Sequence, residues 1–151
     1  MLRTIHSPDW RAIAGSLSLL WAGVLAGVSF LATPVQFTAA SITLPVALDV
    51  GQVTFAALNR FEIVAAVVLA VVVIARARSA LNIAAGALLL AIVTTQTLWL
   101  LPGLDERVAM IISWTAPPPS SLHLLYVLAE GTKVVALVTL ATANVRFRRP
   151  A

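Results

Sequence analysis

Residues 63–74 read IVAAVVLAVVVI, an unbroken apolar run without a charged or polar side chain. The apolar character reaches back to about residue 56 and on to residue 75, which is close to the roughly 20 residues that a helix needs to cross a bilayer. Similar runs occupy residues 12–32, 80–101 and 122–145. The sequence therefore predicts an all-α integral membrane protein with one domain, a four-transmembrane-helix bundle with external loops at 33–55 and 102–121.

The composition supports the same class. Hydrophobic residues make up 60% of the 151-residue chain and charged residues 11%, with a mean hydropathy of +0.99. Soluble domains carry about 25% charged residues, so lipid is the expected solvent of this chain. The first run is longer than the apolar segment of a signal peptide, about 7–15 residues, and is interpreted as a retained span.

The arginines indicate the orientation of the spans. With the N-terminus in the cytoplasm, seven arginines that flank the apolar runs all fall on the cytoplasmic side, where such residues are enriched. The predicted topology is therefore N-in/C-in. The net charge of +4 then reflects topology, and no nucleic-acid partner is expected. The seven residues are Arg3, Arg11, Arg76, Arg78, Arg146, Arg148 and Arg149.

The two predicted external loops contain recognisable local signals. Pro34 is expected to limit the first helix, whereas Pro45 suits the first turn of a new one. From there Asp49, Gln52, Asn59 and Glu62 recur at helical spacing, which predicts one continuous helix from near Pro45 into the second span. In the second loop, the apolar residues 108–114 are expected on the membrane surface, followed by a stiff spacer at prolines 117–119.

Polar side chains recur at one depth in all four spans. Counted from the arginine or serine at the cytoplasmic end of each run, Ser29, Glu62, Gln96 and Glu130 lie 14 to 18 positions outward. At 1.5 Å per residue this places them about 21–27 Å above the inner surface. Asn59, Arg60 and Lys133 join the same layer, together with threonines 94, 95 and 97.

Ionisable side chains at this depth are costly, at about 2.5–3.5 kcal/mol each near a helix centre. They are expected to face the interior of the bundle and to pair, or to line a wet cavity. Lys133 follows Glu130 by three positions and so shares its face, which Tyr126 and His123 extend outward. Two interpretations have equal weight: a structural network that holds the helices in register, and a ligand-binding or ion-pathway site. The candidates for such a site are Glu62, Glu130, Lys133, Arg60, Asn59, Gln96 and His123.

Other motifs have weaker functional readings. GVLAG at 23–27 is a GxxxG pattern and predicts close helix packing within the bundle. Trp21, in mid-span, is assigned to packing. A metal at His123 would need Glu130 or Glu62, and His123 and Glu130 are separated by two helical turns, about 10 Å. Without a cysteine, a catalytic triad order, a phosphate loop or an HExxH motif, we assign no catalytic residue and no metal. The sequence leaves the cofactor open and favours a protein without enzymatic activity over an enzyme.

Two segments carry a family resemblance: GVSFLATPVQF at 27–37 and LNRFE at 58–62. A small-residue first span that ends in a Pro-x-x-Phe motif, followed by a helix with Asn, Phe and Glu, resembles a family of small four-span bacterial membrane proteins of unknown function. That family is distantly similar to a eukaryotic transmembrane protein linked to cisplatin resistance. The resemblance covers about the first half of the chain and implies a four-helix membrane bundle, without a reaction or catalytic residues.

Three functional hypotheses follow. The first is a bundle in a bacterial inner membrane whose polar layer binds or conducts a proton, an ion or a small molecule, with an oligomer as its expected form. The second is a structural or accessory subunit of a larger membrane complex. The third is an oxidoreductase with haem or quinone, which is the weakest because the only histidines, His6 and His123, fall on opposite sides of the membrane.

Overall fold

The computed structural model describes residues 9–75 and 79–145. Within these ranges all regular structure is helical, and four continuous helical segments are long and apolar enough to cross a membrane: Trp10–Gln36, Leu44–Ala75, Ala80–Ile112 and Leu122–Asn144. Six arginine positions that support the predicted topology (3, 76, 78, 146, 148 and 149), and His6, lie outside the described residues. An all-helical chain with four such helices fits the predicted class of multi-pass membrane protein.

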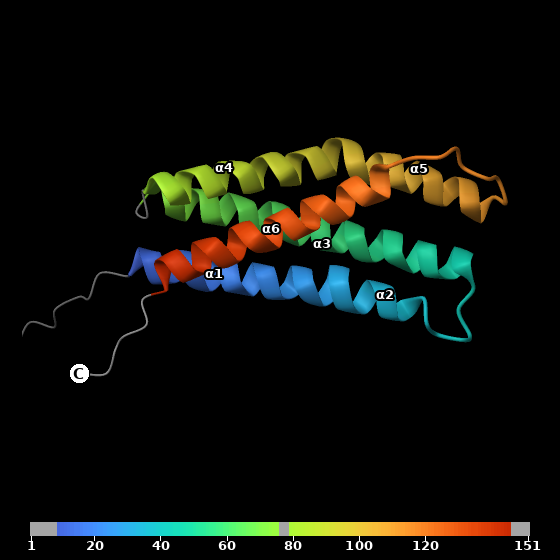
Figure 1. Cartoon of the computed structure of the whole chain (residues 1–151), viewed down its shortest axis with the longest axis horizontal. Coiled ribbons are helices and arrows are strands. Elements are labelled where there is room, and N and C mark those ends of the chain that lie inside the picture. Colours follow the sequence, from blue (N-terminus) through green and yellow to red (C-terminus); the bar gives the residue numbers. More distant parts are fainter. Residues whose placement is uncertain (1–8, 76–78, 146–151) are drawn as a thin grey trace, which may run out of the picture.

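The four segments run side by side along the long axis of the molecule (Figure 1). The first comprises α1 (Trp10–Leu25), a π-helix η1 (Ala26–Ala32) and α2 (Thr33–Gln36), and the second is α3 (Leu44–Ala75). The third comprises α4 (Ala80–Thr95), a π-helix η2 (Gln96–Leu100) and α5 (Leu101–Ile112), and the fourth is α6 (Leu122–Asn144). We call the end that holds the start of α1 and the end of α6 the terminal end, and the opposite end the loop end.

The helices pack as a ring in which α1 contacts α3 and α6, and α4 contacts the same two helices. Between the middle of the bundle and the terminal end, large side chains from every helix fill the interior, among them Leu25, Leu69, Leu89 and Leu137, each at most 1% exposed. The outward faces are also apolar: Val53, Val64, Val71 and Val135 are all more than 60% exposed. Helices that are apolar on all sides are typical of membrane spans.

The helices extend beyond the predicted spans, because two prolines do not end them. Pro34 and Pro102 each lie in the first turn of an α-helical stretch that follows a π-helix. Proline lacks an N–H and its ring clashes with the carbonyl four residues earlier. The wider π turn accommodates this, since Thr33 and Leu101 donate to the carbonyls five residues before them, on Val28 and Gln96.

The predicted loops are therefore shorter than expected. The connections between helices are residues 37–43 and 113–121, in place of 33–55 and 102–121. Residues 108–112 continue the third helix as part of α5 and do not form a separate surface segment. The continuous helix predicted from near Pro45 is confirmed, as α3 begins at Leu44 and runs unbroken to Ala75.

Glycine packing differs from the sequence interpretation. A Cβ added at Gly23 or Gly27 would meet nothing within 4 Å, so the GxxxG motif makes no close helix contact in the bundle and that prediction is wrong. The close approach occurs at Gly15 instead, where a Cβ would lie 2.7 Å from a methyl group of Val145 and 3.2 Å from its backbone nitrogen. Gly15 thus permits the tight crossing of α1 and α6 at the terminal end.

Candidate functional site

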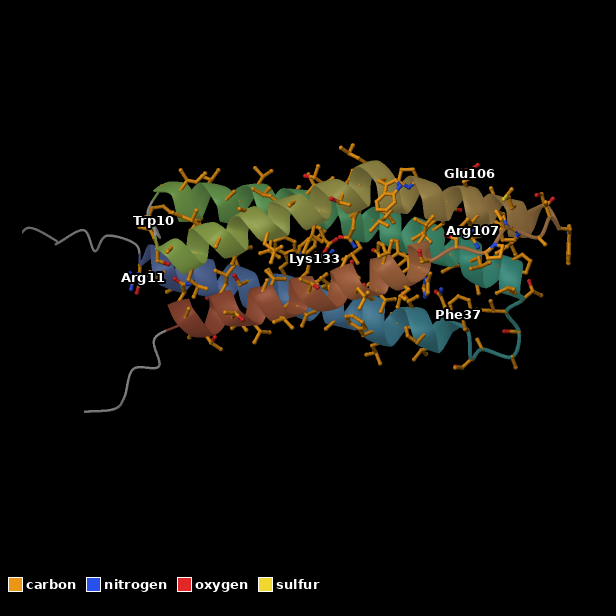
Figure 2. The ribbon with its side chains drawn as sticks, turned by 45° about the horizontal axis from the view of Figure 1, so that its top comes forward. Trp10, Arg11, Phe37, Glu106, Arg107 and Lys133 are labelled. Carbon is orange, nitrogen blue, oxygen red and sulfur yellow. The ribbon has the colours of Figure 1, made fainter. Side chains whose placement is uncertain are left out.

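A cluster of three ionisable side chains lies in the middle of the bundle. Lys133 on α6 is fully buried, and its Nζ lies 2.5 Å from Glu62 Oε1 on α3 and 2.8 Å from Glu130 Oε1 on α6. Both carboxylates are 1% exposed. Figure 2 shows Lys133 at the centre of the bundle, far from the labelled charges at the two ends. We refer to Glu62, Glu130 and Lys133 as the charged triad.

Neutral donors from the other two helical segments complete the shell around the triad. The Trp21 indole N–H of α1 donates to Glu62 Oε1 at 3.1 Å. The Ser29 hydroxyl of η1 donates to Glu130 Oε2 at 2.9 Å, and Gln96 Nε2 of η2 donates to Glu130 Oε1 at 2.8 Å. The triad and its donors therefore join all four helical segments at one level of the bundle.

Two of the donors to Glu130 come from π-helical segments. Ser29 lies in η1 and Gln96 in η2, on opposite sides of α6, so each π-helix directs one polar side chain to the same carboxylate. Such π-helical segments are rare and occur frequently at functional sites. Here the two prolines that require the wider turns lie five or six residues further along the chain.

One acceptor in this shell has no partner. Gln96 is 1% exposed, and its Oε1 is the one buried side-chain oxygen or nitrogen in residues 9–75 and 79–145 that lacks a hydrogen bond. The opposite amide orientation would place Oε1 against Glu130 Oε1, where two acceptors would repel. Buried polar groups without partners are uncommon and often indicate a missing donor, such as a water molecule.

The charges of the triad do not balance. Two carboxylates and one ammonium leave one net negative charge when all three groups are ionised. Arg60 does not supply the missing positive charge: it is exposed and lies with Asp105 in a separate recess between α3 and the third segment. Among the described residues, the ion pairs are the two formed by Lys133.

A pocket of about 390 Å³ leads from the surface to the triad. It lies between the first helical segment and α6, with Phe55 of α3 also contributing. Phe30 and Phe37 are half exposed at its rim, whereas Tyr126 is 4% exposed and meets the Phe55 ring edge-on at a centroid distance of 5.2 Å. Of the triad, only Glu130 lines this pocket, next to Ser29.

The structure brings together part of the set singled out from the sequence. Ser29, Glu62, Gln96, Glu130 and Lys133 are in contact, as their shared depth predicted. Asn59 accepts a hydrogen bond from Thr97 at 3.0 Å and lines the recess that holds Arg60. His123 is exposed and lines the same pocket as Glu130, whereas Arg60 lies apart. The role of these residues in binding a ligand stays a prediction.

Sequence reasoning missed Trp21 as a member of this site. Trp21 is 0% exposed and does pack in the core, but its indole N–H also satisfies a triad carboxylate. A signal was available, because a tryptophan buried in mid-span needs an acceptor for its N–H. Trp21 also lies eight residues before Ser29, which places both on a similar helix face.

Comparisons with known proteins do not extend these observations: no protein-family model, no curated protein and no solved structure matches the chain. The similarity to a four-span bacterial family noted above stays a prediction from the residues. The geometry of the site is therefore the basis of the function proposed below.

Proposed function

We propose that the protein is a multi-pass protein of a bacterial inner membrane, with both termini in the cytoplasm, and that it binds an exchangeable proton on the charged triad. The membrane location is supported by the four apolar helices and their exposed aliphatic faces. The orientation is supported by the arginines, because the sequence segments next to the terminal end of the bundle are rich in arginine, as cytoplasmic segments of membrane proteins are.

The observation that carries the proposal is the unbalanced charge of a triad whose members are at most 1% exposed and of which Glu130 lines a pocket open to the surface. A buried charge without a partner costs several kcal/mol. Lys133 compensates one carboxylate, and a proton shared by Glu62 and Glu130 would compensate the other. The two carboxylates lie on either side of one ammonium, so a proton on either of them leaves a neutral ion pair beside a neutral acid.

Access to this proton differs between the two carboxylates. Glu62 is enclosed by Lys133 and Trp21, whereas Glu130 lines the open pocket. In the proposed orientation the pocket lies in the outer half of the membrane. The unpartnered oxygen of Gln96, whose amide donates to Glu130, offers a place where a water molecule could donate and extend a proton path.

Infrared spectroscopy tests this proposal, because a protonated carboxyl absorbs apart from carboxylates. We expect one protonated carboxyl in the wild-type chain at neutral pH and none in Glu130→Gln or Glu62→Gln. Glu106→Gln, an exposed carboxylate of α5, is the matched control and should retain the band. A wild-type spectrum without this band, or a band unaffected by both triad variants, would contradict the proposal.

The orientation has its own test. A reporter that is active only in the cytoplasm should work when fused after Ala151 or inserted near Ser79, and should fail when inserted near Pro118. Cytoplasmic activity at Pro118 would refute the N-in/C-in arrangement.

A second candidate function is that of a structural subunit of a larger membrane complex. The observation that favours it is that the triad and its donors connect all four helical segments, as a register-fixing network would. Under this alternative, triad variants would change the stability and assembly of the protein in parallel. Loss of proton binding in Glu130→Gln with unchanged assembly would exclude a purely structural role.

A further inference from the structure

The pocket beside Glu130 combines two features that a positively charged ligand requires. Its walls are rich in aromatic rings, from Phe30, Phe37, Phe55 and Tyr126, and its polar wall is formed by Glu130 and Ser29. Its volume of about 390 Å³ lies within the usual range of small-molecule sites, about 300–1,000 Å³. A ligand that enters would therefore meet rings at the rim and a carboxylate further in.

The order of the charges favours a cation over a neutral or anionic ligand. Glu130 reaches the pocket, whereas Lys133 and Glu62 lie behind it and do not line it. The triad lacks one positive charge, so a ligand with a single positive charge would complete it in place of the proton. The Ser29 hydroxyl bonded to Glu130 Oε2 can rotate, which would free that oxygen for the ligand.

The chemistry of the wall favours an organic cation over a metal ion. Hard metal cations require six or more oxygen ligands, and the described residues contain no group of three or more side chains suited to hold a metal. Aromatic faces attract ammonium groups within about 6 Å of the ring centroid, and rings that surround a cation are the usual recognition site of quaternary ammonium ligands. Here several rings come from three different helical segments.

We infer that this pocket binds an organic monocation, a quaternary ammonium or protonated amine with an apolar body, with Glu130 as its counter-charge. The inference rests on the proposed proton site and deepens it: the cation and the proton compete to neutralise the one net negative charge of the triad. Because the rim residues Phe30 and Phe37 are half exposed at the outer surface of the bundle, the cation enters laterally, between the first helical segment and α6.

The test uses the full chain in a non-ionic maltoside detergent, which lacks choline headgroups. Benzyltrimethylammonium is titrated by calorimetry, with neopentylbenzene as a neutral ligand of the same shape, in which carbon replaces the ammonium nitrogen. We expect saturable binding of the cation, at least tenfold tighter than that of the neutral ligand. Equal binding of the two would show an apolar cavity that admits any hydrophobic molecule, and absence of cation binding would likewise overturn the inference.

Variants locate the site. Glu130→Gln should weaken cation binding at least tenfold, and Phe30→Leu should weaken it severalfold without a change in fold, because Phe30 lies at the rim. Glu106→Gln and Trp99→Leu, an exposed carboxylate and an exposed ring outside the pocket, should bind like wild type. If Phe30→Leu and Glu130→Gln both bind like wild type, the pocket is not the site and the inference fails.

The result is separable from that of the proton test. Calorimetry in two buffers of different ionisation enthalpy reports whether cation binding releases a proton. Release of about one proton per cation supports the competition. A protonated carboxyl in the infrared spectrum together with no cation binding would leave the proton site intact and refute only the organic-cation inference.

Discussion

Replacing Lys133 by methionine should be the most damaging single change in the bundle. Methionine keeps the apolar stem of the lysine but removes its charge, so the ionised triad changes from one net negative charge to two. Removing one partner of a buried ion pair costs about 3–5 kcal/mol. Lys133 is 0% exposed and bonds both carboxylates, so we expect a loss of stability at the upper end of this range.

Replacing Glu130 by glutamine should have a much smaller effect on stability. The variant leaves one carboxylate, Glu62, paired with one ammonium, Lys133, and the new side chain can still accept from Gln96 or Ser29. The charged character of those two hydrogen bonds and one of the two ion pairs of Lys133 are lost, while Lys133 keeps Glu62 as a partner, so we expect a cost of about 1–3 kcal/mol. The double variant Lys133→Met/Glu130→Gln should lose less unfolding free energy than the two single variants lose together, by at least about 1 kcal/mol.

Unfolding in mixed micelles by titration with a denaturing detergent measures these free energies. Thr132→Val, at the adjacent exposed position of α6, is the control and should be close to neutral. If the Lys133→Met loss were no larger than that of Glu130→Gln, or if the two losses were strictly additive, the charge argument would be refuted.

Three further changes test the packing of the helices, each measured by the same unfolding assay. Gly15→Ala should lower the free energy of unfolding by about 1–3 kcal/mol, because the new methyl group meets the end of α6. Gly23→Ala should leave it unchanged or raise it by up to about 1 kcal/mol. Equal effects of the two changes would contradict the assigned crossing of α1 and α6. Asn82→Leu should cost about 1–3 kcal/mol, because the Asn144 Oδ1 loses the amide donor that lies 3.1 Å away; a neutral effect would contradict this. Trp114→Gly should raise the free energy of unfolding by up to about 1 kcal/mol, because Trp114 has a φ of 60° just after α5 and glycine adopts this conformation without strain. A clear loss of stability would show that contacts of the Trp114 ring outweigh its backbone strain.

The number of helices and the depth of the polar layer follow from the sequence because both depend on local composition. Apolar run length sets the spans. Counting from Arg76, Ser79 and Arg146 then places Glu62, Gln96 and Glu130 at one level, with only the rise of a helix as input. Lys133 and Glu130 were assigned to one face from their spacing alone, and both do face the interior.

The features that sequence reasoning missed depend on rotation of one helix relative to another. Arg60 lies two positions before Glu62 on α3, about 200° around the helix, so it points away from the triad although its depth is similar. The Gly23 face turns away from the other helices, and no local pattern distinguishes it from the Gly15 face, which contacts α6. Pro34 was interpreted as the end of the first helix because a π turn before a proline leaves no marker in composition.

The two π-helical segments also have a genetic consequence. Each contains about one residue more than an α-helix of the same length would need, and the proline that follows it depends on that extra residue. Deletion of Leu98, an exposed residue within η2, would remove the extra residue and force a regular α-helical turn at Pro102, whose ring would then clash with the carbonyl four residues earlier. The strained turn would begin directly after Gln96, the residue that donates to Glu130. A single-codon deletion in η2 is therefore expected to disturb the helix and the chemistry at the centre of the bundle together.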